Sequence, residues 1–235
     1  MSLRTVWPFP FDEDWSLHQP QEESAYATSP CLRLWTRLTT EPAALGKGTW
    51  AIGANRAPFG QSAWKITFDA TTPVGLLHDV HAELLDLHRE DHSRNQDRLF
   101  DDPTPPHEGY APLFARCWSH DVKTDGAQTF LAPDGLAGIR HRYAARYPDR
   151  SAWRAWGGYP NEPHWQAHFS FGTPTTLVAV LTASLISTEP LHRTVQDVPL
   201  HTRHHLYVAT ATTKQPPSHA PAASLPVAPS SGRTR

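Results

Sequence analysis

Arginine and tryptophan alternate in the segment CLRLWTRL, residues 31–38, in a pattern that can bind nucleic acid. In an extended strand, successive side chains point to opposite faces. One face would hold Leu32, Leu34, Thr36 and Leu38, and the other Cys31, Arg33, Trp35 and Arg37. Bases stack on aromatic rings while cations follow the phosphates, so the second face suits a single-stranded nucleic acid.

The same alternation places more basic and aromatic side chains opposite an apolar face. In AWKITFDA, residues 63–70, Lys65 lies opposite an apolar set made of Trp64, Ile66 and Phe68. In the second half of the chain, Trp165, Ala167 and Phe169 point inward. The opposite face of that half holds Arg140, Arg142, Arg154, Trp156 and His168. We therefore predict a non-enzymatic module that binds single-stranded DNA with cations Arg33, Arg37, Lys65, Arg140, Arg142 and Arg154, stacking residues Trp35 and Trp156, and His168 on the same face.

Charge placement agrees with this prediction better than total charge does. The net charge of the chain is −2, which by itself indicates no nucleic-acid partner. Residues 76–102 carry eight acidic and three basic residues, whereas residues 31–75 carry five basic and two acidic residues. The predicted strands are therefore basic, and the segment that follows them is acidic.

A protein interface is the alternative use of the same face. Arginine beside an exposed tryptophan can be simple cross-strand packing, with a cation–π contact of ~0.5–1 kcal/mol. Tryptophan and arginine are also enriched at interface hot spots. An interaction scaffold or a homo-oligomer built through this face stays open beside the nucleic-acid prediction.

Signals for catalysis, cofactors and metals are absent from the sequence. It contains no GxSxG elbow, no GxxxxGK[ST] loop and no GxGxxG after a predicted strand. The two cysteines, Cys31 and Cys117, form no CxxC, and we expect buried or half-buried thiols. We expect a solvated polar helix face from His78, His81, His88 and His92, and adventitious metal binding at most from His201, His204 and His205. We therefore predict no catalytic residue, no cofactor and no structural metal.

Length and composition indicate a globular chain without a membrane span. The 235 residues are 39% hydrophobic, enough for one large core or two small ones. No run of about 18 apolar residues occurs. The opening MSLRTVWPFPFDEDW lacks the pattern of a secretory signal, so we expect a cytoplasmic location.

An internal repeat organises the chain. Phe11, Trp15, Pro30, Arg37 and Trp50 recur 103 positions later, as Phe114, Trp118, Pro133, Arg140 and Trp153. Trp64, Phe68 and Thr72-Pro73 then recur 101 positions later, as Trp165, Phe169 and Thr173-Pro174. We predict a first repeat at 5–100, a Pro-rich extended linker at 101–112, a second repeat at 113–190, a C-terminal extension at 191–210 and a disordered tail at 211–235.

Each repeat has several short alternating runs and then one helical pattern. Thr72 and Thr173 offer N-cap hydroxyls before a proline at the first helical position. An amphipathic helix over 73–91 and a more apolar one over 174–187 follow. The predicted fold is α+β, with two tandem repeats that each form a twisted antiparallel β-sheet followed by one α-helix, related by a pseudo-twofold axis.

The second repeat resembles the SPDY domain, a streptomycete domain of unknown function that usually occurs in two copies. The match is carried by LAPDGLAGIRHRY, AWRAWGG and HWQAHFSFGTPTTLVAVLTASL. The first repeat keeps AWKITF and TTP but has SPCL where the second has APDG. The resemblance implies two copies and is silent on activity. Strands followed by a helix, twice, are also similar to the arrangement of Whirly-type single-stranded DNA binders, an analogy at the level of fold only.

Overall fold

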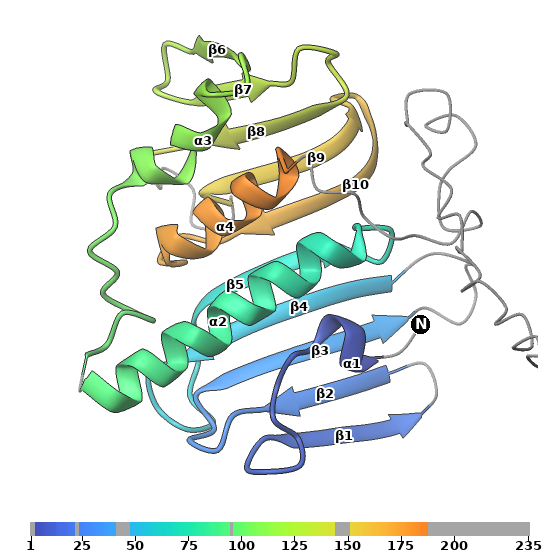
Figure 1. The fold of residues 1–235 in the computed structure, drawn as a ribbon, viewed down its shortest axis with the longest axis vertical. Coiled ribbons are helices and arrows are strands. Elements are labelled where there is room, and N and C mark those ends of the chain that lie inside the picture. Colours follow the sequence, from blue (N-terminus) through green and yellow to red (C-terminus); the bar gives the residue numbers. More distant parts are fainter. Residues whose placement is uncertain (1–2, 22–23, 41–47, 95, 144–150, 188–235) are drawn as a thin grey trace, which may run out of the picture. The chain divides into compact units, whose positions relative to one another are not determined.

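The strands of both repeats join in one antiparallel sheet in the computed structural model of the chain (Figure 1). The structure describes residues 3–21, 24–40, 48–94, 96–143 and 151–187, which belong to one unit within residues 1–190. Ten strands are ordered β1-β2-β3-β4-β5-β10-β9-β8-β7-β6. The predicted C-terminal extension and disordered tail lie outside the described residues.

The first repeat contributes five strands and the long helix. It contains α1 (Leu3–Val6), β1 (Ser16–Gln21), β2 (Ser24–Thr28), β3 (Leu34–Thr40), β4 (Gly48–Asn55), β5 (Ser62–Asp69) and α2 (Val74–Arg94). The second repeat has α3 (Ala111–Phe114), β6 (Ser119–Val122), β7 (Gln128–Leu131), β8 (Ala137–His141), β9 (Trp153–Tyr159), β10 (Glu162–Phe169) and α4 (Thr175–Leu185), preceded by the 3₁₀ helix η1 (Pro106–Gly109).

These elements confirm an α+β fold with a large antiparallel sheet and two tandem repeats. The expectation of a separate sheet for each repeat is wrong, because β5 pairs with β10 and continues the sheet across the repeat boundary. The prediction of one helix per repeat is also incomplete, because the structure contains the short helices α1, α3 and η1 besides α2 and α4. In each repeat the strands follow sequence order from an outer edge, β1 or β6, to the centre, β5 or β10. The central register pairs Thr67 with His168, which are equivalent positions of the two repeats.

One apolar core lies between the sheet and its helices. Both α2 and α4 lie across the same face of the sheet, and they contact each other (Figure 1). The inward alternation predicted for β5 and β10 is confirmed, since Trp64, Ile66, Phe68, Trp165, Ala167 and Phe169 are all buried in this core. Burial of each large side chain among them, such as Ile66, Phe68 and Phe169, contributes roughly 1.5–3 kcal/mol.

The helix starts differ from the predicted threonine caps. The N-cap of α4 is Pro174, and Thr173 Oγ1 donates instead to the carbonyl oxygen of Ser170 at 2.8 Å. Thr72 Oγ1 is buried, and no described residue forms a hydrogen bond with it. The acceptor at the start of α4 comes from far away in the sequence, from Asp102, whose Oδ2 accepts the backbone N–H of Thr176 at 2.9 Å.

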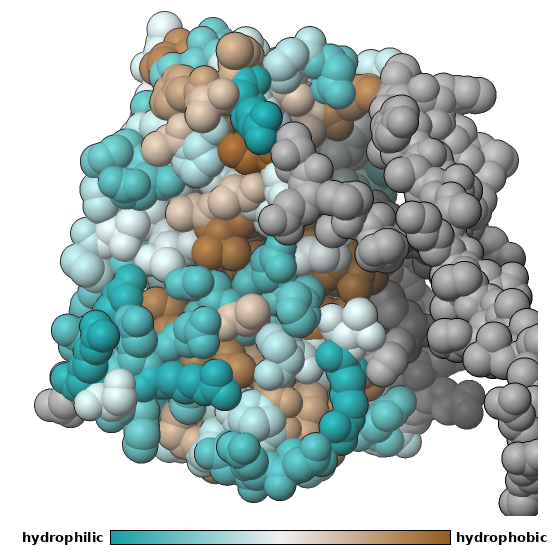
Figure 2. All heavy atoms as spheres, in the orientation of Figure 1, coloured by the Kyte–Doolittle hydropathy of each residue, from teal (hydrophilic) through white to brown (hydrophobic). Residues whose placement is uncertain are grey.

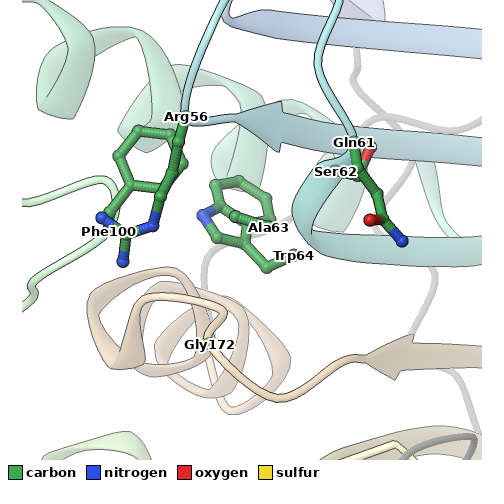
Figure 3. A pocket seen from close by; sticks show the side chains of 7 residues that line it. All are labelled: Arg56, Gln61, Ser62, Ala63, Trp64, Phe100 and Gly172. Atoms are coloured by element: carbon green, nitrogen blue, oxygen red, sulfur yellow. The ribbon is translucent and has the colours of Figure 1, made fainter.

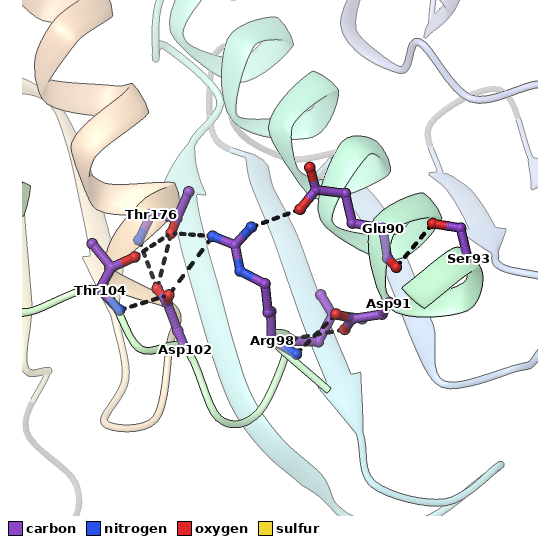
Figure 4. Close-up of polar contacts among 8 residues, drawn as sticks. Glu90, Asp91, Ser93, Arg98, Asp102, Thr104 and Thr176 are labelled. Atoms are coloured by element: carbon purple, nitrogen blue, oxygen red, sulfur yellow. Dashed lines mark hydrogen bonds and ion pairs between the residues drawn. The ribbon is translucent and has the colours of Figure 1, made fainter. Parts of the chain in front are cut away.

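A polar network ties α2, the segment after it and α4 together (Figure 4). Arg98 donates to Glu90 of α2 at 2.6 Å and to Thr176 Oγ1 at 3.4 Å, and its guanidinium lies 4.0 Å from Asp102. Asp91 accepts the backbone N–H groups of Arg98 and Leu99. The network therefore holds the first repeat to the first turn of α4.

The segment predicted as an extended linker is partly folded. Residues 106–109 form η1, and the ring of Tyr110 stacks on Phe130 with centroids 4.7 Å apart. Tyr110 also lies beside Trp153, so this segment packs on the core of the second repeat. None of the described helices combines the length and the apolar character needed to span a membrane.

Candidate nucleic-acid interface

Alternate residues of the ten strands form the face of the sheet opposite α2 and α4, which we name the far face. Pairing registers align one residue of every strand in a single row across it. From β1 to β6 that row is His18, Tyr26, Arg37, Ala51, Thr67, His168, Arg154, Arg140, Thr129 and Asp121. The neighbouring row on each side points into the core.

The predicted cations Arg37, Arg140 and Arg154 all lie in this row. Arg37 is exposed, whereas the other two are half-buried. Arg140 and Arg154 are directly opposite each other on β8 and β9. Their Nε groups donate to neutral acceptors, Arg140 to Thr129 Oγ1 at 3.2 Å and Arg154 to Gln166 Oε1 at 3.0 Å. Because neither acceptor is charged, the positive charges of this pair are not neutralised by these contacts. Like charges directly across two strands also repel each other.

Burial and the neighbouring arginine charges together lower the pKa values of Arg154 and His168. The pKa of Arg154 is lowered by burial and then by the charges of Arg140 and Arg142, with Asp69 opposing the shift. The pKa of His168 is lowered by burial and then by Arg154. These side chains come from three adjacent strands and the residue after β8, so the positive potential is concentrated in the second repeat.

Two aromatic rings of the far face, one half-buried and one exposed, lie in the first repeat. Trp35 of β3 is half-buried and lies over Gly53 of β4, where a Cβ would overlap its ring. Lys65 of β5 is exposed and pairs with Gly53 in the register. Tyr26 is 37% exposed and faces Arg37 across β2 and β3. Tyr26 was not among the predicted site residues, although its alternation with Ala25 and Ala27 in SAYAT is typical of a strand.

The predicted stacking role of Trp156 does not fit its position. The ring is on the far face as expected, but only 1% of the residue is exposed. The ring lies over Gly138 of β8, where a Cβ would overlap it. The Arg154 guanidinium lies 5.4 Å from the ring centroid. Trp156 therefore packs against the sheet and offers no free ring to a base.

Arg33 is not on the far face. Leu32 has φ 57°, a left-handed conformation that breaks the alternation before β3 begins. The Arg33 guanidinium turns toward the segment after α2, pairs with Asp97 at 2.8 Å and lies 4.7 Å from the Phe100 ring centroid. This carboxylate already neutralises the charge predicted to bind phosphate.

The opposite side of the molecule carries the acidic residues of α2. Figure 2 shows hydrophilic side chains spread over α2 on this side. The expectation that all its histidines are solvated is wrong for His81, which is fully buried between Thr36 and Leu77. His88 contacts Cys31, and His78 contacts the carbonyl of Thr5. Within the described ranges no three His, Cys, Asp or Glu side chains group as a metal site, and residues 201–205 lie outside them.

A pocket of about 350 Å³ opens where the two repeats meet (Figure 3). Its lining comes from the β4–β5 hairpin, the segment after α2 and the turn before α4: Arg56, Gln61, Ser62, Ala63, Trp64, Phe100 and Gly172. The Arg56 guanidinium lies 5.1 Å from the Phe100 ring centroid and 3.8 Å from an Asp101 oxygen. No motif predicted this pocket, because residues from three distant segments form it.

Comparison with known proteins shows the family of the chain, but the function of that family is unknown. The model of the SPDY domain, a domain of unknown function (DUF317), matches residues 28–89 and 131–191. No curated protein and no solved structure matches the chain, so the Whirly analogy gains no support. The two matched segments span β3 to α2 and β8 to α4, the corresponding parts of the two repeats, and together cover more than half of the sequence. The chain therefore belongs to the SPDY family and carries two copies of its domain.

Proposed function

We propose that the far face binds single-stranded nucleic acid. The observation that carries the proposal is a difference in pairing between the two sides. Among the described residues, no carboxylate forms an ion pair with Arg37, Lys65, Arg140, Arg142 or Arg154. By contrast, Arg33, Arg56, Arg89 and Arg98, near α2 and the segment after it, each have an acidic partner. A face whose cations lack internal partners is suited to an external polyanion.

The positions of these groups favour a flexible strand. Four strand spacings separate Arg37 from Arg154, roughly 19 Å at ~4.8 Å per spacing. Phosphates would lie along β8 and β9, where the arginines cluster, and bases would stack at Tyr26 and Trp35 on β2 and β3. Stacking adds ~1–3 kcal/mol per base and does not depend on sequence. The proposed contact residues are Tyr26, Trp35, Arg37, Lys65, Arg140, Arg142, Arg154 and His168.

We also infer that the two repeats are related by a pseudo-twofold axis at the centre of the sheet. The symmetric strand order and the pairing of Thr67 with His168 support this relation. The far face departs from the symmetry in charge, since Ala51 of the first repeat stands where the second has Arg154. A strand bound across both halves would therefore meet different surfaces. Cytoplasmic location stays a prediction.

Fluorescence anisotropy of a labelled mixed-sequence single strand, with the matching duplex beside it, tests the proposal. With five phosphate-binding cations, the slope of log K against log salt concentration should approach roughly −3.5. The double variant Arg140→Ala/Arg154→Ala should flatten this slope by about 1.4, because each cation contributes about 0.7. Trp35→Ala should weaken binding at every salt concentration.

Arg89→Ala is the matched control. Arg89 is an exposed arginine of α2 that pairs with Asp86, so its loss should leave binding unchanged. No binding at low salt, or equal weakening by the control, would overturn the proposal. A homo-oligomer that resists salt and dissociates on Trp35→Ala would instead establish the far face as a protein interface.

A further inference from the structure

The turn between β2 and β3 places the thiol of Cys31 against an imidazole of α2. Cys31 is exposed, contrary to the expected burial of both cysteines, and its Sγ lies 3.5 Å from His88 Nε2 and 3.3 Å from Ser29 Oγ. Trp15 packs edge-on against the His88 ring, with centroids 5.6 Å apart. The nucleophile thus has an accessible sulfur, a basic neighbour and a ring that holds this neighbour in place, the arrangement that activates cysteines.

Hydrogen-bond donors converge on this sulfur. Burial raises the pKa of Cys31, but hydrogen bonds from His88, Ser29 and the backbone N–H of Arg33, together with the charge of His88, bring it down to about 6. A thiolate can only accept hydrogen bonds, so in that state Nε2 of His88 carries the proton. The Arg33 guanidinium is engaged by Asp97, which leaves His88 as the charged partner from the packed helix.

The second repeat has an anion at the same place in the same turn. Asp134 occupies the position equivalent to Cys31, and its Oδ1 accepts the N–H of Leu136, two residues on, at 2.9 Å. The turn hydrogen bonds match as well: Leu32 N–H to Ser29 O and Gly135 N–H to Ala132 O are both 2.9 Å. In both turns, the backbone N–H two residues on donates to the side chain at this position, from Arg33 to Cys31 and from Leu136 to Asp134.

We propose that Cys31, with His88, is a reactive thiolate that exchanges with low-molecular-weight disulfides, which makes residue 31 a site of reversible S-thiolation. The Cys31 sulfur attacks one sulfur of the disulfide, and a new S–S bond forms as the original S–S bond breaks. The departing half leaves as a thiolate and is protonated by solvent. A second thiol reverses the exchange, so no further oxidant or reductant is needed.

Cys117 is the comparison within the same chain. It is also exposed, and among the described residues no hydrogen-bond donor contacts its sulfur. Full-length Cys117→Ser and Cys31→Ser variants each leave one thiol. Glutathione disulfide is the probe, and the mixed disulfide is measured by intact mass from pH 5.5 to 9.

In the Cys117→Ser variant, Cys31 should already react near its maximal rate at pH 7. Relative to a model thiol with a pKa of about 8.5, it should react roughly sixfold faster at pH 6.5 and about tenfold more slowly at pH 9, because a less basic thiolate is a weaker nucleophile. His88→Gln should move the midpoint of the Cys31 profile up by at least about one pH unit.

Two results would overturn the proposal. One is a pH–rate profile for Cys31 that coincides with the profile of Cys117 or of the model thiol. This comparison requires no variant at His88. The other is a His88→Gln variant that folds, by circular dichroism, and keeps the profile of its parent. Neither result bears on nucleic-acid binding, so this inference and the proposed function are tested separately.

Discussion

At the scale of single residues, a tryptophan and a glycine have exchanged places between the repeats. In the first repeat Trp35 of β3 lies over Gly53 of β4, whereas in the second Trp156 of β9 lies over Gly138 of β8. These pairs occupy equivalent positions with the residue types reversed. The equivalent space on the far face is thus filled by a tryptophan of β3 in the first repeat and of β9 in the second. In both cases the paired residue on the neighbouring strand must be a glycine, because a Cβ there would overlap the ring.

Gly53→Ala should therefore lower the free energy of unfolding by about 1–3 kcal/mol, because the new Cβ overlaps the Trp35 ring. In a Trp35→Ala background the same substitution should cost little, since the overlapping ring is gone. Urea denaturation of the two single variants and the double variant measures this coupling. An equal cost in both backgrounds would show that the ring does not constrain Gly53.

Alternation predicted individual far-face residues where strands are regular, and failed where local geometry intervened. Arg37, Lys65 and Arg154 lie on the face that the alternation of side chains along a strand predicts for them. Arg33 does not, because it lies in the turn before β3 begins, directly after the left-handed Leu32, and pairs with Asp97. Glycine at the equivalent position of the APDG turn was the one sequence signal for this turn. The burial of Trp156 could not be read from its own segment, because it depends on a glycine of the neighbouring strand.

At the scale of elements, a buried histidine joins α2 to β3. His81 Nδ1 donates to the Leu77 carbonyl at 2.6 Å, so its Nε2 accepts the hydroxyl hydrogen of Thr36 at 3.0 Å. Burial lowers the pKa of His81 to about 4. The histidine is therefore neutral in the folded protein at neutral pH.

Acid should destabilise the protein through this residue. Between pH 6.5 and 4 the unfolded chain binds a proton that folded His81 does not, so the free energy of unfolding should fall by up to about 3 kcal/mol as the pH decreases. Burial also lowers the pKa of His141 to about 4, so it adds to the same loss. Measured by urea denaturation, the free energy of unfolding of His81→Gln should depend less steeply on pH than that of the parent. The control His92→Gln, at an exposed position, should keep the parental dependence. A parental slope in His81→Gln would contradict the assignment.

Asp102 gives a second prediction for an element, the start of α4. Its carboxylate accepts the N–H and hydroxyl of Thr176 and the N–H of Thr104, and its side chain is 6% exposed. Asp102→Ala should lower the free energy of unfolding by about 1–3 kcal/mol. Asp101→Ala is the control, because that side chain is 74% exposed and should cost no more than about 0.5 kcal/mol. Equal thermal shifts would refute a capping role.

The sequence predicted both main helices and most strands, because their apolar periods are long and regular. It missed β1, β2 and β7, whose short runs contain proline, small or polar residues: SLHQPQ, SAYAT and QTFL. The cap of α4 could not be predicted, since its acceptor lies 74 residues before the N–H that it binds. Contacts between distant segments leave no periodic signal.

At the scale of the whole molecule, the repeats share one sheet and one core cluster. We expect residues 1–190 to unfold in a single transition seen alike by circular dichroism and tryptophan fluorescence. Phe68→Ala at the centre of the sheet, where Phe68 lies 6.0 Å from Phe169, should lower stability by about 3–5 kcal/mol and keep one transition. Two separate transitions would show that the repeats fold independently.

The duplication itself was predictable, but the joining of its copies was not, because edge-to-edge pairing of β5 with β10 uses backbone groups common to all residues. The pairing of β5 with β10 also covers one edge of each strand. A chain with one copy would leave β5 as an unpaired edge, which invites the same edge of another molecule. Two identical chains meeting there would place Thr67 against Thr67 and complete the sheet as a homodimer. In a single chain the two halves can differ in sequence, and here Arg154 of the second repeat stands where the first repeat has Ala51.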